Sequence, residues 1–330
     1  MTVIAPSQSA PRRALVTGGA GFIGSHVADL FIAEGYSVEI IDDLSSGHRR
    51  NLPDGAPLHE VSVTSPEAAK VIREGGFDVV VHLAAQIDVR KSVADPLFDA
   101  TTNILGTINI LEAIRASGHK TRMAFTSTGG AIYGDFNTPP NVETFVKDPE
   151  SPYAISKLAA EYYLAYYGRV HGVEHVSLRF GNVYGPRQDP HGEAGVVAIF
   201  CTRILEGRPL TIFGDGLQTR DYVYVGDVAR AVFLGATGEI PPTGRVDARA
   251  FNVGTGVGTS VVDLARLLQE AAGSDAEIEF APKRPGEQQE SFLDAAKARE
   301  TLGWEPQVPL SEGLAKTFAW AESLSAARSA

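Results

Sequence analysis

The amino-acid sequence predicts an α/β protein built on a doubly wound parallel sheet, with a smaller α/β region towards its C-terminus. Two observations predict this class. Short runs rich in Val and Ile alternate with stretches of helical apolar spacing, and such alternation gives parallel strands joined by right-handed crossovers. A glycine-rich turn at residues 18–24 follows the first apolar run and opens the first helical stretch, an arrangement typical of the Rossmann fold.

The elements of the first half follow in order. Residues 13–17 form a short apolar strand, and residues 22–34 have the apolar spacing of a helix. Residues 37–41 form a second strand, which ends at Asp42-Asp43. Further strands are expected at 77–83, 123–127 and 175–180, with helices at 95–116 and 153–171 between them.

The pattern changes after Asn182. Residues 185–193 are polar and rich in turn formers, which predicts a loop. A helix at 196–206, a strand at 210–213 and a helix at 260–272 are expected beyond it. We therefore expect a disordered leader at 1–12, a Rossmann domain at 13–181 with returning segments around 222–254, and a mainly substrate-binding domain at 182–330.

Composition excludes several classes of protein. The 330 residues carry a formal net charge of -11, which argues against a surface for nucleic acid or anionic membrane. No run of residues is apolar enough for a membrane span. Cys201 is the single cysteine, so an intrachain disulfide is excluded and a reducing, cytoplasmic compartment is expected. The eight histidines show no metal-ligand spacing, so no metal is expected, and His191 and Glu193 are interpreted as loop residues.

The glycine turn indicates a site for a dinucleotide. Glycines between a strand and a helix let the backbone approach a pyrophosphate, which the helix N-terminus attracts. Asp42 lies about 20 residues further on, where a carboxylate can accept hydrogen bonds from ribose hydroxyls. Such a carboxylate would repel a 2′-phosphate, so the turn predicts NAD rather than NADP.

Tyr153 and Lys157 indicate acid/base chemistry beside that cofactor. They are four residues apart and share one face of the predicted helix. The lysine charge can lower the pKa of the phenol, so that Tyr153 accepts a proton near neutral pH. Hydroxyls at the end of the 123–127 strand, Ser127 or Thr128, could bond the same substrate oxygen.

Taken together, these and further motifs resemble the extended short-chain dehydrogenase/reductases, and among them the NAD-dependent nucleotide-sugar epimerases of the UDP-glucose 4-epimerase type. The similarity runs from about residue 13 to residue 320. The matching segments are 18–24, 42–47, 82–86, 103–107, 133–134, 153–157, 179–186, 214–216, 220–223 and 284–287.

The resemblance implies a mechanism and a set of contacts. Tyr153 would remove the proton of the sugar 4-hydroxyl while C4 gives its hydride to NAD, and the 4-keto sugar would turn before hydride returns to its other face. Contacts to NAD are implied for Gly18, Gly21, Phe22, Ile23, Gly24, Asp42, Asp43, Ser46, Gly47, Val63, Leu83, Ala84, Ala85, Gln86, Asn103, Thr126, Tyr153, Lys157 and Phe180. Contacts to the UDP-sugar are implied for Thr128, Tyr153, Asn182, Val196, Val197, Thr211, Phe213, Arg220, Arg284, Glu287 and Ser291.

Three features of the sequence bear on the catalytic hydroxyl, on NAD binding and on the sugar. Counting from the strand favours Thr128 as the catalytic hydroxyl, whereas counting back from Tyr133 gives Gly129, so Ser127 is an alternative. Ser62-Val63 lacks the Asp that the family uses for adenine, which could loosen NAD. Ser291 replaces a bulky aromatic of better-known members and leaves room for a 2-N-acetyl group.

The sequence also bears on two other enzymatic activities, on a non-catalytic role and on the assembly. A UDP-glucuronate 4-epimerase would want a cation such as Arg187, but Asp189 and Glu193 surround it. A 4,6-dehydratase would need an acid/base pair where Ala131-Ile132 stand, and a non-catalytic sensor would be expected to lose Tyr153 or Lys157. By resemblance, the helices at 95–116 and 153–171 pair across a two-fold axis into a four-helix bundle, which implies a homodimer.

Overall fold

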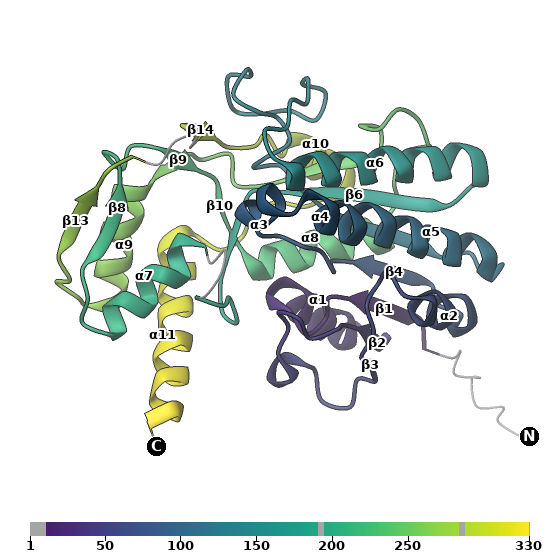
Figure 1. The fold of residues 1–330 in the computed structure, drawn as a ribbon, viewed down its shortest axis with the longest axis horizontal. Coiled ribbons are helices and arrows are strands. Elements are labelled where there is room, and N and C mark those ends of the chain that lie inside the picture. The colour runs from purple at the N-terminus through teal and green to yellow at the C-terminus, as the bar shows by residue number, and fades with distance from the viewer. Residues whose placement is uncertain (1–10, 191–194, 284–287, 330) are drawn as a thin grey trace, which may run out of the picture.

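A computed structural model describes residues 11–190, 195–283 and 288–329. Its main body is a seven-stranded sheet in which all neighbouring strands are parallel, in the order β11-β6-β5-β4-β1-β2-β3 (Figure 1). The strands are β1 Arg13–Thr17, β2 Ser37–Ile41, β3 Leu58–His59, β4 Val79–His82, β5 Arg122–Thr128, β6 Glu174–Phe180 and β11 Ala250–Val253. The strand order reverses between β1 and β4, and ligands of open α/β sheets bind at the carboxyl ends of strands beside such a point.

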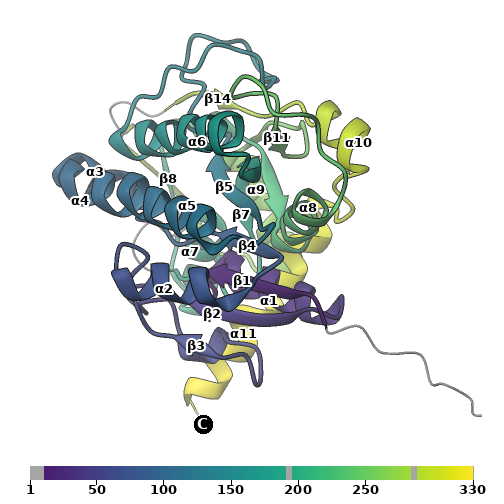
Figure 2. The same cartoon turned by 90° about the vertical axis from the view of Figure 1, so that its right-hand side faces the viewer.

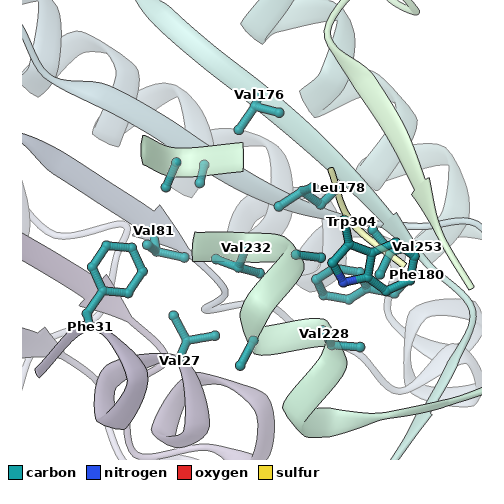
Figure 3. Packing of buried hydrophobic residues seen from close by; sticks show 14 of the residues in the cluster. Val27, Phe31, Val81, Val176, Leu178, Phe180, Val228, Val232, Val253 and Trp304 are labelled. Atoms are coloured by element: carbon teal, nitrogen blue, oxygen red, sulfur yellow. The ribbon is translucent and has the colours of Figure 1, made fainter. Parts of the chain in front are cut away.

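Helices cover both faces of this sheet (Figure 2). α1 (Phe22–Ala33) and α8 (Val225–Thr237) lie on one face, and α2 (Pro66–Gly75), α5 (Gly106–Ser117) and α6 (Pro152–His171) lie on the other. The first face buries Val27 and Phe31 of α1 against Val232 of α8 and the strands (Figure 3), and Trp304 is fully buried at its edge. Each face thus has its own apolar core, as a parallel sheet requires.

The start of α6 is determined by its local sequence. The Ser151 hydroxyl accepts the N–H of Ala154 at 3.3 Å, and Pro152 occupies the first helical position, where its missing N–H costs nothing. The helix ends at Gly172, whose φ of 69° closes it in the left-handed conformation. Tyr153 therefore stands in the first turn, next to the carboxyl ends of the strands.

A smaller region packs beside the sheet, at the left of Figure 1. Its core lies among α7 (Val196–Leu205), α9 (Val261–Ala272) and α11 (Leu310–Ser329), next to the parallel pair of β8 (Leu210–Phe213) and β13 (Ile278–Ala281). Two short sheets join it to the main body. They consist of β7 (Asn182–Tyr184) with β10 (Tyr222–Tyr224), and of β9 (Thr219–Arg220) between β12 (Thr259–Ser260) and β14 (Glu290–Ser291).

The predicted doubly wound α/β class is confirmed, with two differences of detail. The helix expected at 95–116 is interrupted, because α4 (Pro96–Ala100) passes through a π-helical turn, η2 (Thr101–Leu105), into α5. Of the returning segments, β11 joins the main sheet and α8 covers it, whereas β10 pairs with β7 in a separate two-stranded sheet. The domain boundaries stay a prediction. Among the described residues, no helix combines the length and apolar character needed to cross a bilayer.

Candidate active site

The glycine turn between β1 and α1 leaves the first turn of α1 available to an anion. Gly18 has a φ of 73°, and a Cβ on it would lie 2.7 Å from the backbone nitrogen of Ala84. A Cβ on Gly24 would lie 2.1 Å from the carbonyl oxygen of Gly18. Gly21 precedes the helix and provides no side-chain cap, and the first turn contains no acidic residue. The N–H groups there can therefore receive a pyrophosphate.

Asp42 connects that turn to the loop after β2. Its carboxylate accepts the N–H of Ala20 at 2.9 Å and of Leu44 at 2.8 Å. Burial raises the pKa of Asp42, and these two hydrogen bonds oppose the shift. A Cβ on Gly47 would lie 2.8 Å from Oδ1 of Asp42, so the loop must pass close to the carboxylate. Asp43 and Ser46 are exposed in the same loop.

A chain of hydrogen bonds fixes the segment 83–86 after β4. Thr17 Oγ1 accepts the N–H of Ala84 at 3.2 Å and contacts His82 Nδ1 at 2.7 Å. His82 Nε2 contacts Thr107 Oγ1 at 3.1 Å, and that hydroxyl donates to the carbonyl of Asn103 at 2.6 Å. Because Thr107 uses its proton on Asn103, His82 must donate from Nε2 and accept at Nδ1. Burial and the charge of Lys157 lower the pKa of His82 to about 3, so the ring is neutral.

Tyr153 and Lys157 lie together on α6, facing the carboxyl ends of β4 and β5. Lys157 is only 4% exposed, and its Nζ lies 4.6 Å from the centre of the Phe125 ring on β5. Burial lowers the pKa of Lys157 to about 8, although Glu161 and Asp99 oppose this. The expected lowering of the Tyr153 pKa is wrong for the protein alone. Burial raises that pKa, and the negative charge of Asp99 raises it further.

The two candidate hydroxyls point to opposite faces of β5. Ser127 is paired in register with Arg179, whose side chain reaches α6, so Ser127 lies on the α6 face. Its Oγ is buried and has no hydrogen-bond partner among the described residues. Thr128 ends the strand and is partly exposed. Thr126 Oγ1 already donates to the carbonyl of His82 at 3.2 Å.

The side chains of Gln86 and Asn103 form hydrogen bonds within the protein. The Asn103 amide nitrogen contacts the carbonyl of Gln86 at 2.9 Å, Asp99 Oδ1 at 3.1 Å and Ser156 Oγ at 3.1 Å, and its oxygen accepts the N–H of Gln86 at 2.9 Å. The Gln86 amide donates to Asp99 Oδ1 at 3.0 Å. This cluster, which we call the Asp99 cluster (Gln86, Asp99, Asn103 and Ser156), joins the cofactor segment to α6. Sequence reasoning missed Asp99.

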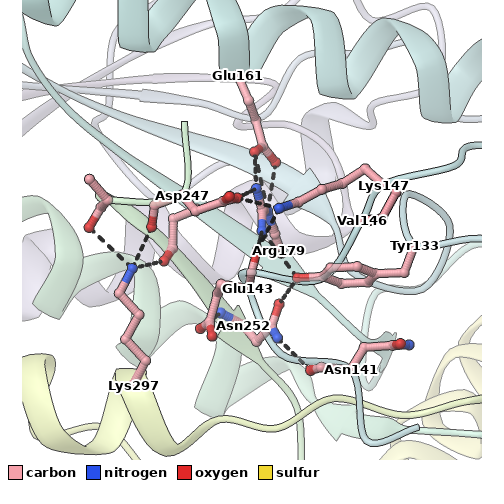
Figure 4. Close-up of polar contacts among 12 residues, drawn as sticks. Tyr133, Asn141, Glu143, Val146, Lys147, Glu161, Arg179, Asp247, Asn252 and Lys297 are labelled. Atoms are coloured by element: carbon pink, nitrogen blue, oxygen red, sulfur yellow. Dashed lines mark hydrogen bonds and ion pairs between the residues drawn. The ribbon is translucent and has the colours of Figure 1, made fainter. Parts of the chain in front are cut away.

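A buried ionic network lies behind the catalytic helix (Figure 4). Arg179 of β6 and Glu161 of α6 have fully buried side chains, with Nη2 and Oε2 2.6 Å apart. Arg179 also donates to Asp247 at 2.8 Å and to Tyr133 Oη at 3.1 Å. Lys147 lies 2.5 Å from Asp247. Because Glu161 follows Lys157 by one turn, the network anchors the part of α6 that carries the lysine. The motif at 179–186 contained Arg179, but only the structure reveals its partners.

Asp221 organises the predicted substrate side. It is 1% exposed, its N–H donates to the carbonyl of Ser291 at 3.0 Å, and its carbonyl accepts the N–H of Asn182 at 2.6 Å. Burial raises the pKa of its carboxyl, against several hydrogen bonds. The donors are Thr255 N at 2.7 Å, Thr255 Oγ1 at 2.6 Å, Gly256 N at 3.1 Å and Leu293 N at 3.1 Å. Asp221 thus connects strands of both parts of the molecule.

Asn182 and Ser291 bond the main chain of Asp221, and Arg220 precedes it in the chain. Asn182 is exposed and its Oδ1 would lie 3.6 Å from a Cβ on Gly130. Arg220 donates to the carbonyl of Thr219 at 2.8 Å and has no carboxylate partner among the described residues. Ser291 is 2% exposed, with its Oγ 3.4 Å from the Gly130 carbonyl. The structure therefore brings Asn182 and Ser291 next to Gly130, which follows β5, while Arg220 lies on the strand that pairs with Ser291.

Other predicted residues have structural roles as well. The side chains of Val63, Phe180 and Val197 are buried in the apolar cores, so any contact of these residues with a ligand would come from their main-chain atoms. Thr211 and Phe213 share the face of β8 opposite its core residues, and Thr211 Oγ1 accepts from Arg203. Val196 starts α7 at the edge of the smaller core. Arg284 and Glu287 lie outside the described residues, as do His191 and Glu193.

The comparison with known families decides the classification. The family model described as GDP-mannose 4,6 dehydratase matches residues 15–317. The chain belongs to this family. The predicted membership of the extended short-chain dehydrogenase/reductases is thereby confirmed. A relative in Mycolicibacterium smegmatis, a UDP-glucose 4-epimerase, is 46% identical over 310 residues, which are 92% of this chain and 97% of the relative.

Solved structures are similar over the same length. The UDP-glucose 4-epimerase of Thermotoga maritima, solved with UDP-glucose, has a TM-score of 0.89 and 47% identity, covering 94% of this chain and 99% of its own. That of Thermus thermophilus, solved with NAD, has a TM-score of 0.87 and 45% identity, with the same coverage. The open first turn of α1, the tightly packed glycines and the carboxylate of Asp42 fit NAD in this chain.

Proposed function

We propose that this protein is an NAD-dependent UDP-hexose 4-epimerase that interconverts UDP-glucose and UDP-galactose. The observation that carries the proposal is the placement of Tyr153 and Lys157 at the start of α6, where Lys157 Nζ lies 4.6 Å from the ring of Phe125 on β5, in the same parallel sheet whose β1 leads into the glycine turn. Relatives and solved structures that are 45–47% identical over nearly the whole chain are UDP-glucose 4-epimerases. The enzyme is therefore an isomerase.

Each residue has a defined task in this reaction. Bound NAD supplies the acceptor and donor of the C4 hydride, and its positively charged nicotinamide favours the phenolate form of Tyr153. Tyr153 removes the proton of the sugar 4-hydroxyl and returns it after the 4-keto sugar has turned. Lys157 stays next to Tyr153, where its charge stabilises the phenolate. Asn182 and Arg220 hold the diphosphate as a pivot, since guanidinium binds phosphate with charge-assisted hydrogen bonds.

Thr128 is the better candidate for the hydroxyl that binds the sugar oxygen. Its side chain is partly exposed at the end of β5, whereas the Oγ of Ser127, although it lies on the sheet face that α6 covers, is fully buried. Replacing Thr128 with Ala is expected to lower kcat about 100-fold or more, while Ser127→Ala keeps most of the activity. Equal losses in both variants would contradict the assignment to Thr128.

Two other activities have less support. The guanidinium of Arg187, the cation that a glucuronate would need, is already paired with Asp29 at 2.7 Å. The family model's description includes a 4,6-dehydratase, but the positions for the extra acid/base pair hold Ala131 and the fully buried Ile132. A UDP-N-acetylhexosamine remains a second substrate class, because Ser291 contributes little bulk beside Gly130.

The experiment is to incubate the purified protein separately with UDP-glucose, UDP-N-acetylglucosamine and UDP-glucuronate, without added cofactor, and to resolve the products. The 4-epimer of UDP-glucose is expected, since NAD should remain bound through the cycle. No epimer from any sugar, even with added NAD, would overturn the proposal. Ser291→Tyr should reduce the turnover of the N-acetyl substrate selectively if Ser291 determines the room at C2.

The domain roles, the assembly and the location are part of the same proposal. We assign the binding of NAD to residues 13–181 with segments around 222–254, and the binding of the nucleotide sugar mainly to residues 182–330. We place the enzyme in the cytoplasm. A homodimer through the helical stretch that ends in α5 and through α6 is supported by exposed apolar side chains on the turn η2, which leads into α5, and on α6. They are Leu105, Tyr162, Tyr163, Tyr166 and Val170. Sedimentation equilibrium should give twice the chain mass, and Tyr162→Glu should shift the equilibrium to the monomer.

A further inference from the structure

Asp99 has a buried carboxyl group, and the hydrogen bonds of the Asp99 cluster occupy only one of its two oxygens. The residue lies on α4 and is 1% exposed. Its Oδ1 accepts from the amides of Gln86 at 3.0 Å and Asn103 at 3.1 Å. Its Oδ2 is buried without a hydrogen-bond partner among the described residues. A carboxylate oxygen in this situation is costly, so a use for its charge is to be expected.

The cluster holds this charge against the catalytic turn of α6. Asn103 connects Asp99 to Ser156 Oγ at 3.1 Å, and Ser156 donates to the carbonyl of Tyr153 at 2.9 Å. Ser156 lies between Tyr153 and Lys157 in the same helical turn. Asn103 stands in the π-helical turn η2, and such turns recur at functional sites. The distance between Asp99 and the catalytic pair is thus fixed by side-chain bonds.

The other charges around the pair are already balanced or neutral. Glu161 on α6 is paired with Arg179, and His82 on β4 is neutral at working pH. Arg90 and Lys91 on α3 (Val89–Ala94) are exposed to solvent, which screens their effect. Asp99 raises the pKa of Tyr153, and it also raises the pKa of Lys157. It is the anion without an ion-pair partner that acts on both groups, within the described part of the chain.

We propose that Asp99 is a positioning residue whose buried carboxylate sets the pH range in which Tyr153 works. It disfavours the phenolate and favours the ammonium of Lys157, so Tyr153 stays protonated until a bound cofactor and substrate supply the opposing positive charge. The inference deepens the proposed epimerase function and rests on it. It assigns a role to a residue that is itself only 1% exposed.

The test is the pH profile of kcat/KM for Asp99→Asn in the NAD-loaded full chain. The substitution can keep the acceptor used by Gln86 and Asn103 and changes the unpartnered Oδ2 to an amide nitrogen. The acid limb is expected to move to lower pH by about one unit, since removing a nearby charge shifts a pKa by that order. Asp99→Glu, which keeps the charge, should leave the limb closer to its original place. An acid limb that stays unchanged in Asp99→Asn would overturn the proposal.

Two further measurements distinguish an effect of the Asp99 charge from a structural change in the cluster. They also distinguish failure of this proposal from failure of the epimerase function. Ser156→Ala removes a hydrogen bond of the cluster without changing charge, and it should lower the rate without moving the limb. Tyrosinate absorbance of the NAD- and UDP-loaded protein, minus that of its Tyr153→Phe variant, reports Tyr153 without any turnover. In Asp99→Asn this signal should appear at lower pH. If no epimer forms but the signal moves, the epimerase function fails and the role of Asp99 stands; an unmoved signal refutes that role.

Discussion

Breaking the ion pair of Arg179 and Glu161 should destabilise the protein strongly. Arg179→Met removes all three contacts to the Glu161 carboxylate, of 3.1, 3.1 and 2.6 Å, and leaves that carboxylate fully buried. Removing one partner of a buried pair typically costs about 3–5 kcal/mol. Asp247 keeps Lys147 as a partner at 2.5 Å, so its share of the loss is small. We therefore expect the free energy of unfolding to fall by about 3–5 kcal/mol.

Urea denaturation followed by circular dichroism measures this loss, and a second charge removal tests its cause. In the double variant Arg179→Met with Glu161→Gln, no uncompensated carboxylate remains. The double variant should then be more stable than the sum of the single losses predicts, by about 1–3 kcal/mol. A loss below about 1 kcal/mol for Arg179→Met, or strict additivity, would refute the reasoning, because both outcomes mean that the buried charge carries no penalty.

Three further outcomes are expected. Gly24→Ala should reduce the NAD content of the purified protein without abolishing folding. The new Cβ would lie 2.1 Å from the carbonyl oxygen of Gly18 and would push α1 away from the glycine turn. An NAD content equal to that of the wild type would contradict this. The free energy of unfolding should fall as pH drops from about 6.5 towards 3. In this range His82 binds a proton in the unfolded chain but stays neutral in the folded protein, where its pKa is about 3. His82→Gln should flatten that slope in urea titrations at several pH values, and an unchanged slope argues against His82. Asp221→Asn should raise the KM for UDP-glucose about tenfold, because one of the two buried carboxylate oxygens that accept hydrogen bonds is lost. The NAD content of the variant should stay at the wild-type level, which serves as the control. A fall in kcat with an unchanged KM would exclude a role of Asp221 in substrate binding.

Local sequence determined the elements and the chemical type of the site. The glycines of the first turn, the acidic end of β2 and the four-residue spacing of Tyr153 and Lys157 are properties of short segments, and each appears in the structure on its predicted element. Turn and helix geometry depend on neighbouring residues, so the sequence predicts them well. The π-helical turn at Asn103 escaped prediction, because apolar periodicity does not distinguish it from a regular helix.

Tertiary structure alone decided how charge is distributed around the catalytic pair. The sequence suggested that Lys157 lowers the pKa of Tyr153, whereas burial and Asp99, 54 residues earlier, act in the opposite direction. The pairing of Arg179 with Glu161, and the donors that Asp221 collects from the segments after β11 and β14, also join residues far apart in the chain. Electrostatic interactions depend on distance in space and on desolvation, and neither can be read from sequence spacing once the chain has folded back on itself.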